Sequence, residues 1–283
     1  MRPQIEDSVK TGTGNTHTVD SDAVGRAADL LDTAATTGRP CPPIRELFAA
    51  GDLAGAYEVQ AELTRRRLAV GARVTGRKIG LTSPAVQAQL GVDQPDFGVL
   101  FEDMDVSASA EVPSDRLLQP KAEAEIAFVL SADLADGDLG PEQIRSAVDY
   151  AVAALEIVDS RVAGWDITIT DTIADNASSG LFILADTRLT LAEFEPREVR
   201  MRMSVDGVEV STGTGAACLG DPLEALAWLA RTAREYGEPL RAGQVVLSGA
   251  LGPMAPTPPG SHVEAVIEPF GTVTARFSAK EGS

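Results

Sequence analysis

Residues 123–130 read EAEIAFVL, so two glutamates one position apart lead into an unbroken apolar run. This run has the length and composition of a β-strand, which places residues i and i+2 on the same face, roughly 7 Å apart at the backbone. Glu123 and Glu125 would then project side by side, and both carboxylates could reach one ion. The alternative is an ordinary half-exposed strand on which both glutamates face solvent.

A third glutamate favours the ion-binding interpretation. Glu156 stands in a second apolar segment, ALEIV at residues 154–158. An unpaired carboxylate buried there would be very costly unless it were neutralised, paired or bound to a metal. Carboxylate oxygens suit Mg²⁺ or Mn²⁺ better than Zn²⁺. The three glutamates together predict a hard-metal site.

Composition limits the classes of function. The chain has 283 residues, is 44% hydrophobic and carries a formal charge of −18, which argues against binding nucleic acid or an anionic membrane surface. An anionic substrate must therefore be attracted locally. Cys41 and Cys218 show no disulfide or CxxC pattern, and we find neither a signal-peptide core nor a membrane-spanning apolar run. We expect a cytoplasmic protein.

Three sections follow one another along the chain. Residues 1–20 are polar and aperiodic and predict a disordered leader. Residues 21–72 predict a helical section, with one helix from Ser21 or Asp22 to a stop at Gly38 and a second from the cap Asp52 to about Leu68. Residues 73–283 form the third section, a strand-rich domain. Its predicted strands cover residues 74–81, 97–101, 123–130, 152–158, 181–184, 199–211, 244–248, 262–267 and 272–277.

Local signals refine this domain. Asp206-Gly207 between alternating runs predicts a β-hairpin, and a helix is expected from Pro222 to Tyr236 with Asp221 as its cap. Strands and helices alternate too irregularly for a Rossmann sheet. The pattern predicts an α+β fold with a small helical N-terminal section.

Acid–base groups must be sought outside histidine. His17 lies in the leader and His262 at a late strand edge, so a Ser-His-Asp or Cys-His arrangement is poorly supported.

Arg77 and Lys78 end a predicted strand on opposite faces, and one of them points inward if the apolar neighbours Val74 and Ile79 are buried. From the residues alone, a surface lysine on an edge strand is the favoured interpretation. Asp96 stands before the next strand and could be a base, a residue that supports another site residue, or part of a turn, which is the default interpretation.

Several segments could contact a substrate. Small polar residues gather after the strand of Glu156, at 159–161 and 171–180, where we expect loops whose groups can hydrogen-bond a carboxylate. Ser248-Gly249 follows another strand, and its glycine permits close approach to a ligand. Ser83 and Pro84 predict the start of a short helix.

Five of these motifs, in this order, closely resemble those of the 2-keto-4-pentenoate (2-hydroxypenta-2,4-dienoate) hydratases of the fumarylacetoacetate-hydrolase-like superfamily. They are GRKIGLT at 76–82, QLGVDQPDFG at 89–98, EAEIAF at 123–128, ALEIVDSR at 154–161 and DNASSG at 175–180. The resemblance extends from about Asp22 to the C-terminus. It implies a strand-rich mixed β core, a sandwich or roll that is partly barrel-like, with flanking helices and assembly as a homo-oligomer.

The resemblance also implies residue roles. Mg²⁺ or Mn²⁺ would be held by Glu123, Glu125 and Glu156, with Lys78 and Asp96 as catalytic residues. The candidate substrate-binding residues are Leu81, Ser160, Asn176, Ser178, Ser248 and Gly249. The substrate would be a small anionic 2-hydroxydienoate from meta-cleavage of an aromatic or steroid ring, and a pathway aldolase or decarboxylase is a candidate partner.

The expected reaction ketonises the dienol by proton transfer to C5 and then adds water at C4, giving 4-hydroxy-2-oxopentanoate. Lys78 would exchange the proton near the enol oxygen, and Asp96 would orient the lysine or the water. Three alternatives stay open at this point: a 2-oxohex-3-enedioate (4-oxalocrotonate) decarboxylase, an acylpyruvate-type hydrolase, and a non-catalytic partner subunit. Metal-dependent turnover would separate an enzyme from a binding subunit.

Overall fold

A curled sheet organises the molecule. The computed structural model describes residues 20–83, 87, 92 and 94–279. Within them a 7-stranded sheet has the order β2-β1-β8-β3-β4-β5, with β9 paired to β3. All its pairs are antiparallel except β1 with β8. The strands are β1 Val74–Gly80, β2 Asp96–Phe101, β3 Lys121–Leu130, β4 Val148–Val158, β5 Ser179–Leu184, β8 Val245–Leu247 and β9 Ala255–Pro256.

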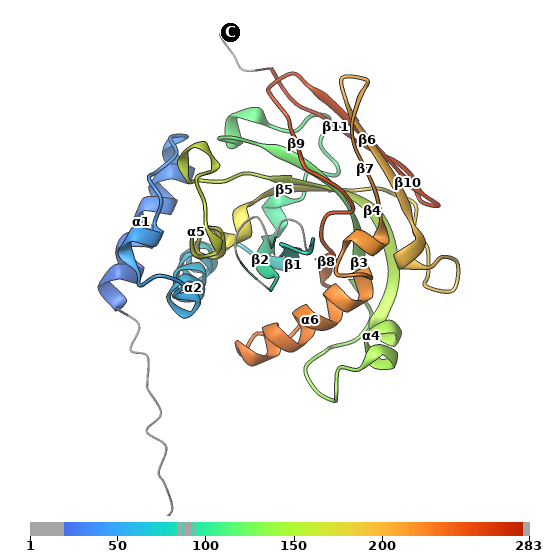
Figure 1. Ribbon diagram of the computed structural model, residues 1–283, viewed down its shortest axis with the longest axis horizontal. Coiled ribbons are helices and arrows are strands. Elements are labelled where there is room, and N and C mark those ends of the chain that lie inside the picture. The colour runs from blue at the N-terminus through green and yellow to red at the C-terminus, as the bar shows by residue number, and fades with distance from the viewer. Residues whose placement is uncertain (1–19, 84–86, 88–91, 93, 280–283) are drawn as a thin grey trace, which may run out of the picture.

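A 4-stranded antiparallel sheet, in the order β11-β10-β6-β7, adjoins the first, and β11 contacts β4 and β5. Figure 1 shows the long curved strands β3 and β4 between this sheet and the helices α1, α2 and α5. The half-barrel of mixed strands with flanking helices confirms the predicted fold class. The strands of the second sheet are β6 Arg200–Val205, β7 Val208–Thr214, β10 His262–Glu268 and β11 Gly271–Arg276.

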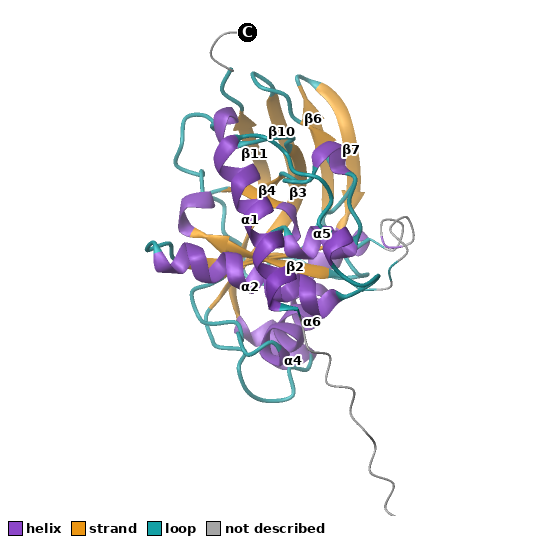
Figure 2. Ribbon diagram, turned by 90° about the vertical axis from the view of Figure 1, so that its left-hand side faces the viewer, coloured by secondary structure: helices purple, strands orange, loops and turns teal. Residues whose placement is uncertain are grey.

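The long helices begin and end at their predicted signals. Helix α1 (Ser21–Thr37) ends at Gly38 in the left-handed conformation, and α2 (Leu53–Ala69) begins after Asp52, whose side chain accepts from the Gly55 N–H. Helix α6 (Pro222–Glu235) is capped by Asp221. Figure 2 views the molecule from the side of α1, α2 and α5.

The predicted hairpin is also present. Strands β6 and β7 pair in antiparallel register around Asp206 and Gly207, whose φ angles are 51° and 78°. Two successive positive φ values are the requirement of the type I′ turn, which matches the twist of the flanking strands.

Two helices correct the sequence interpretation. Residues 171–174, expected in a loop, belong to α5 (Ile169–Ala174), in which the Asp171 carboxylate accepts from both the backbone N–H and the hydroxyl of Thr168. This cap outweighs the low helix propensity of the β-branched residues around it. Helix α4 (Pro141–Ala147) was not predicted, although Pro141 at its first position is a helix-start signal.

Two predictions fall outside the described residues: the leader, apart from Asp20, and the body of the short helix after Ser83. None of the helices in the described part of the chain is both long and apolar enough to cross a membrane.

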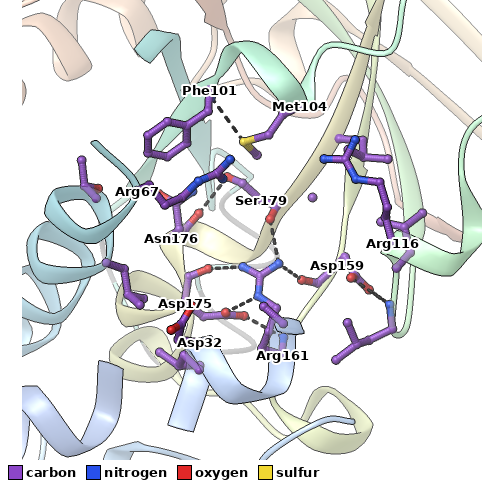
Figure 3. Close-up of a pocket in the computed structure, with 18 of the residues that line it drawn as sticks. Asp32, Arg67, Phe101, Met104, Arg116, Asp159, Arg161, Asp175, Asn176 and Ser179 are labelled. Carbon is purple, nitrogen blue, oxygen red and sulfur yellow. Dashed lines mark hydrogen bonds and ion pairs between the residues drawn. The ribbon is translucent and has the colours of Figure 1, made fainter. Parts of the chain in front are cut away.

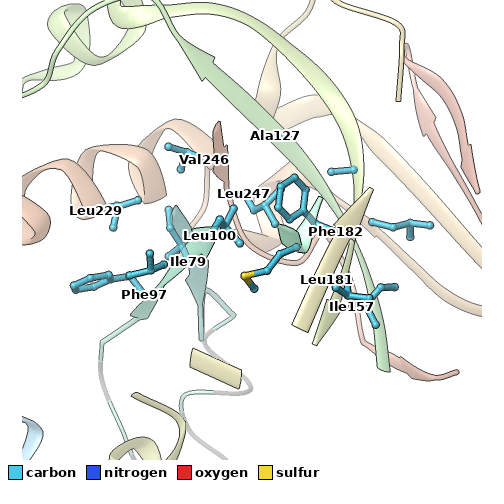
Figure 4. Packing of buried hydrophobic residues seen from close by; sticks show 14 of the residues in the cluster. Ile79, Phe97, Leu100, Ala127, Ile157, Leu181, Phe182, Leu229, Val246 and Leu247 are labelled. Atoms are coloured by element: carbon cyan, nitrogen blue, oxygen red, sulfur yellow. The ribbon is translucent and has the colours of Figure 1, made fainter. Parts of the chain in front are cut away.

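The hydrophobic core fills the space between α6 and the first sheet and continues to β4 and β5. Figure 4 shows Leu229 of α6 beside Ile79 and Val246, and Phe182 beside Ala127. Phe182, Leu229, Val246 and Ala127 are completely buried, and truncating a buried phenylalanine or leucine to alanine costs about 2–5 kcal/mol. This rigid core holds the central strands in register.

The N-terminal helices are bound to the sheet by aromatic and polar contacts. The rings of Tyr57 and Phe97 stack at 4.8 Å, and Tyr57 lies 4.5 Å from Tyr236. Buried Gln60 donates to the carbonyls of Phe97 and Ile173, each at 2.9 Å. Helix α2 therefore fixes the start of β2 and the end of α5.

Close packing of β1 against β8 makes Gly76 sensitive to substitution. A Cβ at Gly76 would lie 1.8 Å from the Val245 carbonyl oxygen. We expect Gly76→Ala to lower the free energy of unfolding by about 1–3 kcal/mol, because backbone must shift. Urea unfolding measures this change. Gly25→Ala is the matched control, since no atom lies within 4 Å of a Cβ added at Gly25 and alanine favours a helix. Equal stability of the two variants would contradict the prediction.

Candidate active site

Pairing of β3 with β4 brings the three glutamates together. Glu123 lies opposite Glu156 in the antiparallel register, and Glu125 follows two residues along β3 on the same face. One carboxylate oxygen of each residue lies within 4.8 Å of those of the other two. The alternation predicted from the sequence therefore produces one acidic cluster.

The cluster is largely withdrawn from water. Glu125 is 0% exposed and Glu156 is 1% exposed, whereas Glu123 is partly exposed. Within the described residues, Glu125 Oε1 and Glu156 Oε2 have no hydrogen-bond donor. Unpaired buried carboxylate oxygens are costly, and an all-oxygen donor set suits a hard divalent cation. The residues present therefore fit Mg²⁺ or Mn²⁺.

Burial raises the pKa of all three carboxyl groups. The negative charges of Glu156 and Glu123 add to this effect at Glu125, so its pKa stands well above the usual range. For Glu156, burial raises the pKa to about 7, although attraction to Lys78 opposes the shift. The pKa of Glu123 is raised by burial and lowered by Lys78. A bound cation would replace protons as the neutralising charge.

Lys78 supplies the positive charge of the site. It is 3% exposed, its Nζ lies 3.1 Å from Glu156 Oε1, and it donates to the Ala177 carbonyl at 2.9 Å. Strand β1 lies between β2 and β8, so the alternative of a surface lysine on an edge strand is wrong. Burial lowers the pKa of Lys78, but attraction to Glu156 and the other nearby carboxylates outweighs it and raises the pKa.

Arg77 points away from this cluster. It is 6% exposed, and its Nη1 donates to the Gly76 carbonyl. Lys78 is the inward-directed cation that the sequence led us to expect, and Arg77 on the opposite face is buried as well. Both faces of β1 are covered, because the sheet curls around one face and helix α6 packs on the other.

Asp96 joins the cluster from the first position of β2. It is 1% exposed, which excludes an ordinary surface turn, and burial raises its pKa while Lys78 lowers it. Asp96 pairs in register with Gly80 of β1. A Cβ at Gly80 would lie 2.2 Å from Asp96 Oδ1 and 3.5 Å from Lys78 Nζ. Gly80 therefore leaves the space in which the lysine and the aspartate meet.

The loop after β8 contacts the cluster from another side. Gly249, at φ 110°, donates its N–H to Glu125 Oε2 at 2.8 Å. Ser248 is buried, and its hydroxyl has no hydrogen-bond partner among the described residues. Leu81 follows β1 at φ 55° and is partly buried. Of these candidate substrate-binding residues, Gly249 binds the cluster directly, Ser248 precedes Gly249 in the chain, and Leu81 follows Gly80.

The other three candidates surround Asp175. Ser160 Oγ and Ser178 Oγ lie 3.4 and 3.5 Å from Asp175 Oδ2. Burial raises the pKa of Asp175 to about 6, while Arg161 lowers it. The Asn176 amide is bound at both ends to the backbone of Val99. These polar side chains are occupied by the protein itself.

Asn176, Ala177 and Ser178 form an unusual turn with φ angles of 56°, 52° and 51°. A left-handed conformation costs roughly 1–2 kcal/mol for a residue such as alanine or serine, whereas asparagine adopts it more readily. Arg161 holds the turn by donating to the Asp175 carbonyl and to the Ser179 carbonyl. Sequence reasoning missed the Ala177 carbonyl and Gly80. Gly80 was recoverable, because it shares the face of Lys78 two positions away.

A cavity of about 570 Å³ lies beside this turn, and Asn176 and Ser179 are among its lining residues (Figure 3). Arg67, Phe101 and Arg116 line it together with Arg161 and Asn176. The three glutamates and Lys78 are not among its lining residues, so we place the chemistry at the acidic cluster and not in this cavity.

The chain belongs to the fumarylacetoacetate (FAA) hydrolase family, whose C-terminal domain model matches residues 75–278. Within it, the chain is 52% identical to the "TodF product hydratase" of Pseudomonas putida, over 90% of this chain and 96% of that protein. It is 49% identical to the 2-keto-4-pentenoate hydratase of Paraburkholderia xenovorans, over 90% and 95%.

A solved structure is also similar. The 4-oxalocrotonate decarboxylase from Pseudomonas putida G7, complexed with magnesium and adipate, matches with a TM-score of 0.87 and 33% identity, over 92% of this chain and 99% of that one. The family resemblance found in the sequence is confirmed.

The raised carboxyl pKa values predict how pH affects the metal-free protein. The folded state holds protons on Glu125, Glu156 and Asp175 that the unfolded chain releases near pH 4. Stability should therefore fall as pH rises from about 4 to about 7. Thermal melts in a chelator should show a declining melting temperature, and the increase caused by Mg²⁺ should grow with pH.

Glu125→Gln is the control for this prediction. Removing one titrating carboxyl should flatten the pH dependence of the metal-free melting temperature and weaken the response to Mg²⁺. A melting temperature that rises over this window, with the same slope in the variant, would contradict the assignment of these protons.

Gly80→Ala should disturb the site with little effect on the fold. The added methyl group displaces Asp96 from Lys78, and we expect kcat to fall by about 10- to 100-fold. Steady-state kinetics with saturating Mg²⁺ measure this loss, with Gly25→Ala as the control of unchanged rate. A Gly80→Ala enzyme with normal kcat would show that the proximity of Asp96 to Lys78 is not needed.

Proposed function

We propose that the protein is a metal-dependent hydro-lyase that adds water to 2-hydroxypenta-2,4-dienoate and releases 4-hydroxy-2-oxopentanoate. The observation that carries the proposal is the acidic cluster with one buried lysine, found in a chain about half identical to proteins named as hydratases. The proposed context is meta-cleavage degradation of aromatic or steroid rings.

Glu123, Glu125 and Glu156 would hold Mg²⁺ or Mn²⁺. When bound, the cation would supply Lewis-acid charge that attracts the anionic substrate and stabilises its enolate form. This supplies the local attraction for an anion that a chain of charge −18 otherwise repels. The Gly249 N–H, by binding Glu125 Oε2, fixes the orientation of one of the three carboxylates.

Lys78 and Asp96 would carry the proton transfers. Lys78 Nζ is held between Glu156 and the Ala177 carbonyl, where it can give a proton to the enol oxygen or take one from it. Asp96 lies over the same gap at Gly80 and would orient the lysine or the attacking water. We assign Leu81, Ser248 and Gly249 to the substrate pocket, because Gly249 binds the cluster directly and the other two adjoin Gly80 and Gly249 in the chain.

Decarboxylation of 2-oxohex-3-enedioate is the second candidate. The structural match to 4-oxalocrotonate decarboxylase favours it, at 33% identity, and both reactions proceed through a stabilised enolate. The higher identity to named hydratases places hydration first. A hydrolase that relies on histidine is less well supported, because His262 begins β10 in the second sheet, apart from the sheet that carries the glutamates.

The cytoplasm is the proposed compartment, supported by the two buried free thiols of Cys41 and Cys218. We extend the proposal to a homo-oligomer that associates with a pathway aldolase or decarboxylase.

An absorbance assay tests the proposed reaction. Freshly generated 2-hydroxypenta-2,4-dienoate should disappear only when Mg²⁺ or Mn²⁺ is present, with formation of 4-hydroxy-2-oxopentanoate. Glu123→Gln should weaken both metal binding, measured by calorimetry, and turnover. Lys78→Met should keep the fold but reduce kcat by about 100-fold or more, because general acid–base catalysis is lost.

A parallel assay on 2-oxohex-3-enedioate is the control. Release of carbon dioxide from this diacid alone would move the assignment to the decarboxylase. Near-normal turnover by Lys78→Met would remove the lysine from the mechanism.

A further inference from the structure

Strand β2 forms one edge of the first sheet, and a side-chain amide covers part of that edge. Asn176 Oδ1 accepts from the Val99 N–H at 2.7 Å, and Asn176 Nδ2 donates to the Val99 carbonyl at 2.9 Å. These are the two contacts that a neighbouring strand would make. The whole amide of Asn176 is therefore engaged in binding the backbone of β2.

The same contact places the turn over a gap in the sheet. Gly98 of β2 is the register partner of Lys78, and a Cβ at Gly98 would lie 2.4 Å from the Asn176 carbonyl oxygen. Because Gly98 has no side chain, the turn approaches the sheet closely enough for the next carbonyl, that of Ala177, to reach Lys78 Nζ at 2.9 Å.

We propose that Asn176 is a positioning residue for Lys78: its amide fixes the left-handed turn on β2, and the Ala177 carbonyl then sets the place of the ammonium group. Asparagine combines both requirements, since it tolerates a positive φ and offers a donor and an acceptor. The proposal rests on the proposed function, in which Lys78 moves the proton.

This role differs from the substrate contact inferred for Asn176 from the sequence. A residue that binds substrate would mainly affect KM when removed. A residue that positions the catalytic lysine should affect kcat, because the cation and the substrate carboxylate still fix the bound substrate. The two roles therefore make different kinetic predictions.

Two variants separate the amide contact from the backbone strain. Asn176→Gly keeps a residue that accepts φ 56° but removes the amide, whereas Asn176→Ala removes both. With saturating Mg²⁺, both should lose kcat by about 10- to 100-fold, with KM for the dienoate changed by less than about threefold. A normal kcat in Asn176→Gly would overturn the proposal. An increase in KM with an unchanged kcat would also overturn it.

Gln60→Met is the matched control for general destabilisation. It also removes two hydrogen bonds from buried carbonyls, one of them on β2, but it leaves the turn at Ala177 intact. We expect a similar fall in melting temperature with kcat retained within about threefold. An equal loss of kcat in Gln60→Met and Asn176→Gly would reduce Asn176 to a structural residue and overturn its positioning role.

A crystal structure of Asn176→Gly gives a readout that does not depend on turnover. The Ala177 carbonyl should move out of hydrogen-bond range of Lys78 Nζ, and hydrogen exchange at the Val99 amide should become faster than in the wild-type protein. An unchanged contact would overturn the proposal even if the enzyme were active. Conversely, a wild-type protein inactive on the dienoate would reject the proposed function, while these two measurements would still decide whether Asn176 positions Lys78.

Discussion

The arrangement of the active site is constrained by an excess of negative charge buried in the folded sheet, which must be neutralised. Three glutamates and an aspartate share one buried lysine, and burial makes each ionised carboxylate costly. Protons can neutralise the cluster at low pH, and near neutral pH a divalent cation held by the three carboxylates would do so instead. The raised carboxyl pKa values, the unpaired oxygens and the all-oxygen composition are three expressions of this one constraint.

The rest of the fold holds these charges at fixed separations. The β3–β4 ladder sets the glutamates opposite each other, and β8 places β1 with its lysine beside them. Glycines at three points remove side chains where groups must approach: Gly80 below Asp96, Gly98 below the turn, and Gly249 beside Thr82, where the Gly249 N–H binds Glu125. Rigid elements therefore carry the charged groups, and glycines provide the space between them.

Local patterns in the sequence predicted much of this arrangement. Alternation placed Glu123 and Glu125 on one face, and the Asp206-Gly207 hairpin and the capped helix α6 followed from short-range signals. The burial of Lys78 was not predictable in this way, because β8, which covers one side of β1, comes from far later in the chain. The Ala177 carbonyl carries no sequence signature, since every residue has a backbone oxygen.

The covered edge of β2 has a consequence for the behaviour of the protein in a crowded solution. An open sheet edge is a template on which a second chain can add a strand and begin to aggregate. Asn176 occupies both backbone groups of Val99, and Gln60 occupies the carbonyl of Phe97. The Asn176 amide that holds the turn on β2 thus also withholds that edge from other chains, and Gln60 closes the neighbouring position, so one of the two amides links the placement of Lys78 to protection against edge-to-edge aggregation.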